Sequence, residues 1–375
     1  MFTALALLFL SASLASGQQA GQHTDPNVLF RHAVEAQQHG DYRTAIQDYQ
    51  QLLKSHPEAA EVRANLGAAL AHENRFDEAI AQYRLALASA PGNEAIRMNL
   101  ALAYYKKGDL VSARREFETI RKKEPDDPQL AILLGDSEVR LGHAAEAVAM
   151  LAPLEAANAA NTDFEYVYGT ALIRTGKRLE GATRLEKVAE AANSADAYLL
   201  AGSTLIDLNE FARAEKNLDA ALRLNPNLPR VYILAGMAHD MNGDAAGAEP
   251  LLREGLKRNP DDFDANLYLG SILYKRRDMA EAKQYLDRAL QLKPADPTAA
   301  YEMAMWDSTS RQFVDAAKIL EGLVKSNPDW LQPHIELATV YYRLQRPEDG
   351  ARERAIVEKL KAQQQKQGPP KIQQP

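Results

Sequence analysis

The chain carries few residue patterns that could support catalysis or bind a metal. Its eight histidines are scattered, and none forms the His-Glu-x-x-His pair that holds zinc on one helix face. His32 and His39 are seven residues apart and could share a helix face, but no cluster of carboxylates accompanies them. We therefore expect no metal site and no cofactor.

Motifs for nucleophilic or phosphate chemistry are incomplete. No Gly-x-Ser-x-Gly elbow occurs in the chain. Gly176-Lys177 resembles the end of a phosphate-binding loop, but Ala171 stands where that loop needs an earlier glycine. The absence of cysteine excludes disulfides, cysteine nucleophiles and zinc-thiolate sites. We expect no catalytic residue and predict that the chain is not an enzyme.

Composition and charge favour a protein-binding role. The 375 residues are 46% hydrophobic and 25% charged, with a formal net charge of -7. Proteins that bind nucleic acid or anionic membranes through electrostatics need a basic excess, which this chain lacks. We expect a protein or peptide ligand and no nucleic acid partner. The sequence does not indicate the oligomeric state.

The first 17 residues have the pattern of an export signal. An apolar run ending at Leu10 is followed by small residues, and cleavage after Gly17 or after Ala15 would fit the small-x-small rule. No basic residue precedes Leu10, so a buried first helix remains an alternative. The run is shorter than the roughly 20 residues of a membrane span, so we expect no integral span after signal removal. The Gln-rich residues 18–25 are predicted to be a disordered linker, and the expected location is periplasmic or secreted.

A repeat of about 34 residues indicates which secondary-structure elements make up the chain. A turn at Gly40-Asp41-Tyr42 is followed by Ala45, Tyr49 and Pro57. The same spacing returns at Asn74-Arg75-Phe76 with Ala79, Tyr83 and Pro91, and again at Gly108-Asp109-Leu110 with Ala113, Phe117 and Pro125. Glycine tolerates the left-handed conformation that ends a helix, and proline stops the next one. Each repeat is therefore predicted to form two antiparallel helices.

This pattern resembles the tetratricopeptide repeat, or TPR, whose consensus is Leu-Gly-x-x-Tyr, then Ala-x-x-x-Phe, then Pro. The resemblance implies an all-α fold, a right-handed α-α superhelical solenoid of about ten helix-turn-helix repeats. The expected repeats lie near residues 26–59, 60–93, 94–127, 128–161, 162–194, 195–228, 229–262, 263–296, 297–330 and 331–363. A charged last helix would cap the open end, and residues 364–375 are predicted to be a disordered tail.

The fourth and fifth repeats depart from the pattern. Ala159 and Asn193 replace the terminal proline, and Gly181 stands where alanine is expected. We predict a local change of superhelical pitch over residues 155–197, with ordinary sequence drift as the alternative. Whether this segment forms a hinge is left open by the sequence.

The resemblance also places a candidate binding groove. In TPR proteins the first helix of each repeat lines the concave surface at its second, fifth, ninth, twelfth and thirteenth positions, and asparagines at the sixth position can hold a peptide backbone. Transferred to this chain, the predicted groove residues are Phe30, Asn65, Met98, Asn99, Tyr105, Arg140, Tyr166, Arg174, Met237, Met241, Tyr274, Tyr301, Met305, Tyr342 and Arg343. Tyr and Arg are favoured in binding sites, and Met adapts to varied ligands.

Two types of TPR groove can be compared with this sequence. The carboxylate clamp needs Asn at the ninth position, where this chain has Val34, Ala68 and Leu102, so no clamp is expected. An asparagine ladder would be limited to Asn65 and Asn99, and coincidence is the alternative reading.

Together these features predict an exported TPR scaffold or adaptor that binds proteins or peptides in its concave groove. It would assemble a cell-envelope complex. The alternatives are a broad-specificity periplasmic chaperone and an accessory subunit of an envelope enzyme or transporter.

Overall fold

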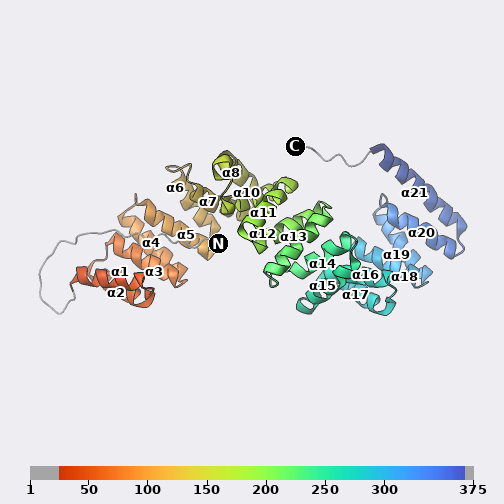
Figure 1. Ribbon diagram of the computed structural model, residues 1–375, viewed down its shortest axis with the longest axis horizontal. Helices are drawn as coiled ribbons and strands as arrows, with labels where there is room; N and C mark the ends of the chain where they lie inside the picture. Colours follow the sequence, from red (N-terminus) through yellow and green to blue (C-terminus); the bar gives the residue numbers. More distant parts are fainter. Residues whose placement is uncertain (1–24, 368–375) are drawn as a thin grey trace. The chain divides into compact units, whose positions relative to one another are not determined.

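The computed structural model describes residues 25–367. The predicted signal peptide, residues 18–24 of the predicted linker, and residues 368–375 lie outside this range. The described residues form twenty-one α-helices and one 3₁₀ turn, without a β-strand (Figure 1). The all-α class and the arrangement in helical pairs, both predicted from the sequence, are confirmed.

The chain divides into two compact units, Met1–Ala192 and Asn193–Pro375. The helices of the first unit are α1 (Pro26–Gln38), α2 (Tyr42–Ser55), α3 (Ala60–His72), α4 (Phe76–Ser89), α5 (Glu94–Lys107), α6 (Leu110–Arg121), α7 (Pro128–Leu141), α8 (Ala144–Leu151), the 3₁₀ turn η1 (Ala152–Leu154), α9 (Glu155–Asn158), α10 (Thr162–Arg174) and α11 (Arg178–Ala192). The boundary at residue 192 falls inside the segment for which the sequence predicts an altered pitch.

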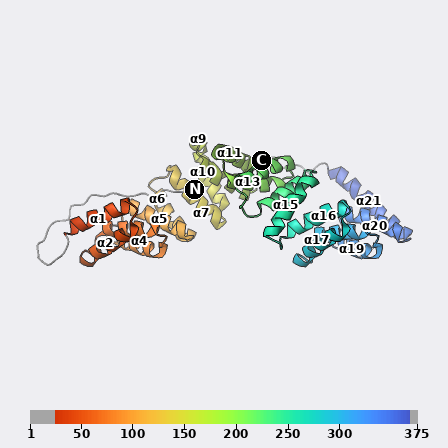
Figure 2. The ribbon, with the colours of Figure 1, turned by 60° about the horizontal axis from the view of Figure 1, so that its bottom comes forward.

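The helices of the second unit are α12 (Ala195–Asp207), α13 (Phe211–Leu224), α14 (Val231–Met241), α15 (Ala245–Arg258), α16 (Phe263–Lys275), α17 (Met279–Leu292), α18 (Pro297–Thr309), α19 (Phe313–Ser326), α20 (Leu331–Arg343) and α21 (Pro347–Gln367). In both units a first helix pairs with the second helix that follows it, as for α3 with α4 and α16 with α17 (Figures 1 and 2).

Local sequence explains where the helices begin and end. Gly40 has a φ of 79°, the left-handed conformation that ends α1. Asp41 then caps α2, because its carboxylate accepts a hydrogen bond from the Thr44 backbone N–H at 3.1 Å. The helix ends at Ser55 with His56 as its C-cap, and Pro57 follows outside the helix. Each pair of helices is therefore joined by a tight turn with its own capping residues.

The core lies where the two helices of a pair cross. Tyr49, Tyr83 and Phe117 are fully buried at equivalent positions of successive second helices. At Gly67 a Cβ would lie 2.8 Å from the Tyr83 ring, so glycine makes room for that aromatic side chain. The consensus residues thus form the packed contacts that the repeat pattern predicts.

First helices of successive pairs also touch one another. These contacts join α1 with α3 and α3 with α5, and in the second unit α14 with α16 and α16 with α18. Successive second helices are also linked by side chains, as where Arg253 on α15 pairs with Glu281 on α17 at 2.6 Å. In Figure 1, α14 and α16 lie on the inner side of the curved path of the second unit, and α15 and α17 on its outer side.

Two details differ from the expectation. The second helix of the fourth repeat is broken, because α8 ends at Leu151 and the 3₁₀ turn that contains Pro153 separates it from α9. Proline lacks the N–H that would continue the helix. At the other end, α21 continues to Gln367, so residues 364–367 of the predicted disordered tail are helical.

Among the described helices, none combines the length and the apolar character that crossing a membrane requires.

Candidate functional site

The candidate site is the surface formed by the predicted groove residues on α1, α3, α5, α7 and α10 in the first unit, and on α14, α16, α18 and α20 in the second. We call it the first-helix face and treat each unit separately. Most of its predicted residues are half-buried or exposed, while Asn99 and Tyr274 are buried, with 3% and 7% of their surface exposed. These two lie beneath the face and cannot reach a ligand without side-chain movement.

In the first unit the structure brings Tyr105 and Arg140 together through a third residue, Asp136. The Tyr105 hydroxyl on α5 donates a hydrogen bond to Asp136 Oδ2 on α7 at 2.5 Å. Arg140, one turn further along α7, places its guanidinium 5.3 Å from the centre of the Tyr105 ring and 3.4 Å from the same carboxylate. Ring, carboxylate and guanidinium therefore hold one another in place.

Burial raises the pKa of Tyr105, and the neighbouring Asp136 raises it further. The phenol therefore stays protonated near neutral pH and serves as a hydrogen-bond donor. Arg140 keeps its charge, and 44% of its side chain is exposed. The cluster consequently combines an exposed cation with a half-buried aromatic ring, a combination common in protein-binding hot spots.

The other predicted residues of the first unit do not form one cluster. Phe30 packs at 6.2 Å from the ring of Tyr49, and so belongs partly to the core. Asn65 is half-buried, and the Oδ1 atom of the buried Asn99 has no hydrogen-bond partner. Tyr166 is half-buried and Arg174 is exposed.

In the second unit, polar side chains link successive first helices. Ser271 on α16 donates to Glu302 on α18 at 3.0 Å, and Ser308 on α18 donates to Glu336 on α20 at 2.6 Å. Sequence reasoning missed Glu302 and Glu336. Both occupy the sixth helix position, where only asparagine was sought, so reading that position for any polar residue could have found them.

Aromatic and sulfur-containing residues lie along the same helices. The Tyr268 hydroxyl on α16 is 3.7 Å from Met241 Sδ on α14. Burial, with Glu336 and Glu302 nearby, raises the pKa of Tyr301 to about 12, and this ring packs 5.3 Å from Trp330. Met237 and Met305 are partly buried against the core of the unit.

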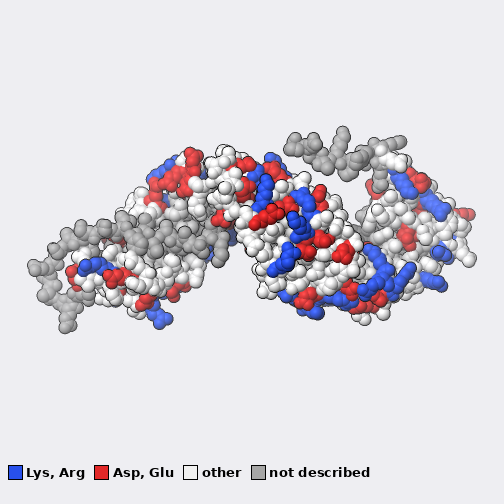
Figure 3. Space-filling view, viewed as in Figure 1, with Lys and Arg blue, Asp and Glu red and all other residues white. Residues whose placement is uncertain are grey.

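The first helix of the last repeat, α20, also carries exposed residues of the face. The Tyr342 side chain is 37% exposed and lies under the Arg354 guanidinium of α21, 4.7 Å from the ring centre. Arg343 is exposed. Positive and negative side chains are interspersed over the visible surface of the second unit rather than gathered by sign (Figure 3).

One group of described side chains has metal-ligating atoms close together. Glu215, Asp219 and His239 each offer one donor atom, and these atoms lie within 4.8 Å of one another. They lie on α13 and α14 and belong to none of the predicted groove positions.

Comparison with protein families finds the tetratricopeptide repeat twice. One repeat model matches residues 30–94, 199–254 and 233–297, and a second matches residues 70–136. Together the matches cover more than half of the chain.

Curated relatives match with low identity over most of this chain. The CTR9 homolog of Arabidopsis thaliana is 24% identical over 76% of this chain and 28% of that protein. The human protein O-mannosyl-transferase TMTC3 is 23% identical over 81% of this chain and 36% of that protein. The chain spans about a third of the length of these relatives.

Among solved structures, the crystal structure of the APC/C hetero-tetramer Cut9–Hcn1 is similar over most of the chain. It aligns with a TM-score of 0.51 at 14% identity, covering 91% of this chain and 88% of the other. At this identity the likeness concerns the fold alone.

Proposed function

Because the chain belongs to the tetratricopeptide-repeat family, whose fold is generally a non-catalytic scaffold for protein interactions, we propose that it is an exported adaptor. In this proposal it binds a protein or peptide on the first-helix face and assembles a cell-envelope complex. Nucleic acid is not among its proposed partners. The apolar run that ends at Leu10 and the small residues after it support export.

The observation that carries the binding role is the cluster of Tyr105, Asp136 and Arg140. Its groups are oriented by one another before any ligand arrives, which reduces the entropy that binding costs. The Tyr105 ring also contacts Phe117 of the second helix, 6.4 Å away, so the cluster rests on the core. The Arg140 guanidinium is left with donors directed at solvent, where a carboxylate or carbonyl of a ligand fits.

The test compares two exposed arginines, one on a first helix and one on a second helix. A photo-crosslinking amino acid replaces Arg140 on α7 or Arg115 on α6, whose side chain is 66% exposed. After irradiation in the native host, a defined partner should be captured from position 140 and not from position 115. Equal capture at both positions, or capture from position 115 alone, would move the binding surface to the second helices.

Purified protein supplies the quantitative part of the test. Arg140→Ala should weaken binding to the captured partner by about tenfold, since a hot-spot arginine contributes on the order of 1–2 kcal/mol. Arg115→Ala should leave the affinity unchanged. One stoichiometric partner is expected of an adaptor, whereas weak capture of many unfolded proteins would identify a chaperone.

The export part of the proposal is tested separately. Cell fractionation should place the protein in the periplasm or medium, and amino-terminal sequencing should begin at Gln18 if cleavage follows Gly17. Recovery in the cytoplasm with residues 1–17 intact would refute export without affecting the binding surface.

A further inference from the structure

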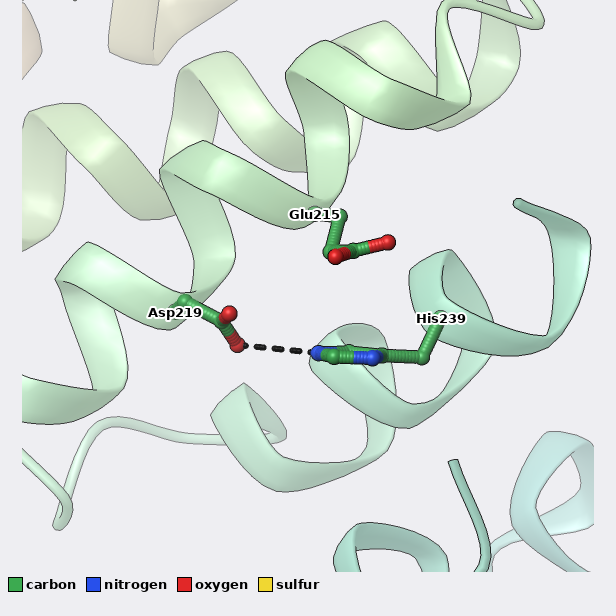
Figure 4. A group of neighbouring side chains, drawn as sticks. All are labelled: Glu215, Asp219 and His239. Atoms are coloured by element: carbon green, nitrogen blue, oxygen red, sulfur yellow. Dashed lines mark hydrogen bonds and ion pairs between the residues drawn. The ribbon is translucent and has the colours of Figure 1, made fainter. Parts of the chain in front are cut away.

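A second site of different chemistry lies between α13 and α14 of the second unit. Glu215 and Asp219 are four residues apart, so they share one face of α13, and both project toward His239 on α14 (Figure 4). The Nε2 atom of His239 is 3.2 Å from Asp219 Oδ1. All three side chains are half-buried, so the group is held by the packing of two helices rather than by a surface loop.

A hydrogen bond at the ring atom Nδ1 fixes the orientation of the His239 side chain. The Nδ1 atom of His239 is 2.8 Å from the carboxylate of Asp244, which also accepts a hydrogen bond from the Gly247 backbone N–H at 2.9 Å. With Nδ1 bonded to that carboxylate, the Nε2 atom is the one directed at Glu215 and Asp219. A carboxylate behind a histidine in this way is the usual support for a histidine that binds a metal.

A glycine makes room for this support. A Cβ on Gly247 would lie 2.7 Å from His239 Nδ1 and still closer to the Asp244 carboxylate, so a larger residue would displace both. Gly247 is the third residue of α15, where glycine still loses more backbone conformational freedom than alanine would. The fold accepts this cost at the position that keeps the histidine and its partner together.

The first carboxylate is oriented as well. The Asn242 amide donates a hydrogen bond to Glu215 Oε2 at 2.8 Å. This bond holds one carboxylate oxygen of Glu215 and leaves the second oxygen available to a cation. Two of the three donor groups therefore have a further hydrogen-bond partner that fixes their direction. Such support is common around metal ligands, whereas a surface ion pair does not require it.

From this arrangement we propose that Glu215, Asp219 and His239 bind a divalent transition-metal ion such as Zn²⁺. Zinc accepts histidine nitrogen and carboxylate oxygen at about 2.0–2.2 Å, which places neighbouring donors roughly 3–4 Å apart. The distance between His239 and Asp219 already suits such an ion, and a small rotation of Glu215 brings in the third donor. The imidazole favours this class over Ca²⁺ and Mg²⁺, which take oxygen ligands.

Three protein ligands leave a coordination position for water or for a ligand atom from another molecule. The ion would also join α13 of one repeat to α14 of the next, since its ligands come from both helices. Binding to the folded state alone would therefore raise the stability of the second unit.

The test is calorimetric titration of Zn²⁺ into the tag-free full chain, which has first been stripped with a chelator. We expect one equivalent to bind, and the affinity to fall at least tenfold in Glu215→Gln and in His239→Ala. Asp244→Asn should weaken binding by about 10–100-fold, because it acts through the histidine. His143→Ala is the matched control and should leave the affinity for Zn²⁺ unchanged. His143 also has a carboxylate 2.8 Å away, on Glu138, but lies outside the proposed site.

A second readout separates coordination from folding. Co²⁺ in place of Zn²⁺ should give visible ligand-field absorption in the native protein and in His143→Ala, but not in Glu215→Gln, which preserves side-chain size. Circular dichroism establishes that each variant is folded. The proposal is overturned if no equivalent binds, or if Glu215→Gln and His239→Ala bind as the native protein does; His239 then serves only as an ionic link between Asp219 and Asp244.

Discussion

Some residues depart from the repeat pattern at buried positions, where an ionisable side chain changes the stability of the fold. Asp307 on α18 is an example, because this ionisable residue is only 6% exposed. Burial raises its pKa to about 6; Asp315 and Asp287 raise it as well, while Lys283 lowers it. In the unfolded chain the same group titrates near 3.8. The folded protein therefore holds a proton there that the unfolded chain releases between about pH 4 and 6.

This difference predicts a pH-dependent effect of Asp307→Asn. Above pH 6 the native carboxylate is charged and buried, which destabilises the fold, and the variant lacks that charge. We expect the variant to be more stable than the native protein by about 1–2 kcal/mol at pH 7.5. The difference should shrink as the pH falls from 6 toward 4, because the native group becomes protonated.

Urea unfolding at pH 7.5 and pH 4.5 measures this difference. The exposed Asp329 supplies the control, since Asp329→Asn removes the same charge from solvent and should show no comparable change with pH. A stabilisation of Asp307→Asn that is equal at both pH values would mean that packing, rather than ionisation, distinguishes the two side chains.

Helix pairs show why some departures from the consensus are required. Gly181 replaces the alanine expected on the second helix of the fifth repeat, and the sequence alone marked it as a sign of degeneracy. In the structure α10 and α11 approach so closely that a Cβ at Gly181 would lie 2.5 Å from the Gly169 carbonyl oxygen. It would also lie 2.7 Å from a side-chain carbon of Ile173. Because one neighbour is backbone, the contact cannot be relieved by a rotamer change.

Gly181→Ala should therefore destabilise the first unit by about 1–3 kcal/mol, the cost of overpacking a close crossing. Gly322→Ala on α19 is the matched control, because no atom lies within 4 Å of the Cβ it would add. That variant should instead be stabilised by about 0.5–1 kcal/mol through helix propensity. Thermal unfolding of both variants gives the comparison, and a neutral or stabilising Gly181→Ala would contradict the close crossing.

The sequence predicted the elements better than their contacts. The spacing of turn and small residues was enough for the helix pairs, because each of those residues acts within its own repeat. The break at Pro153 was missed, since the turn and small residues of the fourth repeat keep their spacing up to Leu151 and the departures noted in the sequence begin after the break. The burial of Asn99 and the meeting of Glu215 with His239 depend on neighbouring helices. Such contacts are set by the packing distance between repeats, which a single sequence does not state.

At the scale of the molecule, each compact unit contains hydrophobic clusters of its own. One cluster extends from Ala33 to Leu172 in the first unit. In the second, one runs from Ile233 to Trp306 and another from Ala304 to Tyr341. In repeat proteins stability is close to a sum of contributions from each repeat and its neighbours. A local loss of packing should therefore spread to adjacent helices and fade with distance along the chain.

Leu286→Ala tests how far such a loss extends. Leu286 on α17 is fully buried next to Gly270, and removing its side chain should cost about 2–5 kcal/mol. Hydrogen exchange measured by mass spectrometry should then accelerate in α14–α18 and remain at the native rate in α3–α7. Leu134→Ala, which truncates a buried residue of the first unit, should give the opposite pattern. If each variant accelerates exchange throughout the chain, the units unfold as one cooperative block, and binding or metal-site variants in one unit must be judged by their effect on both.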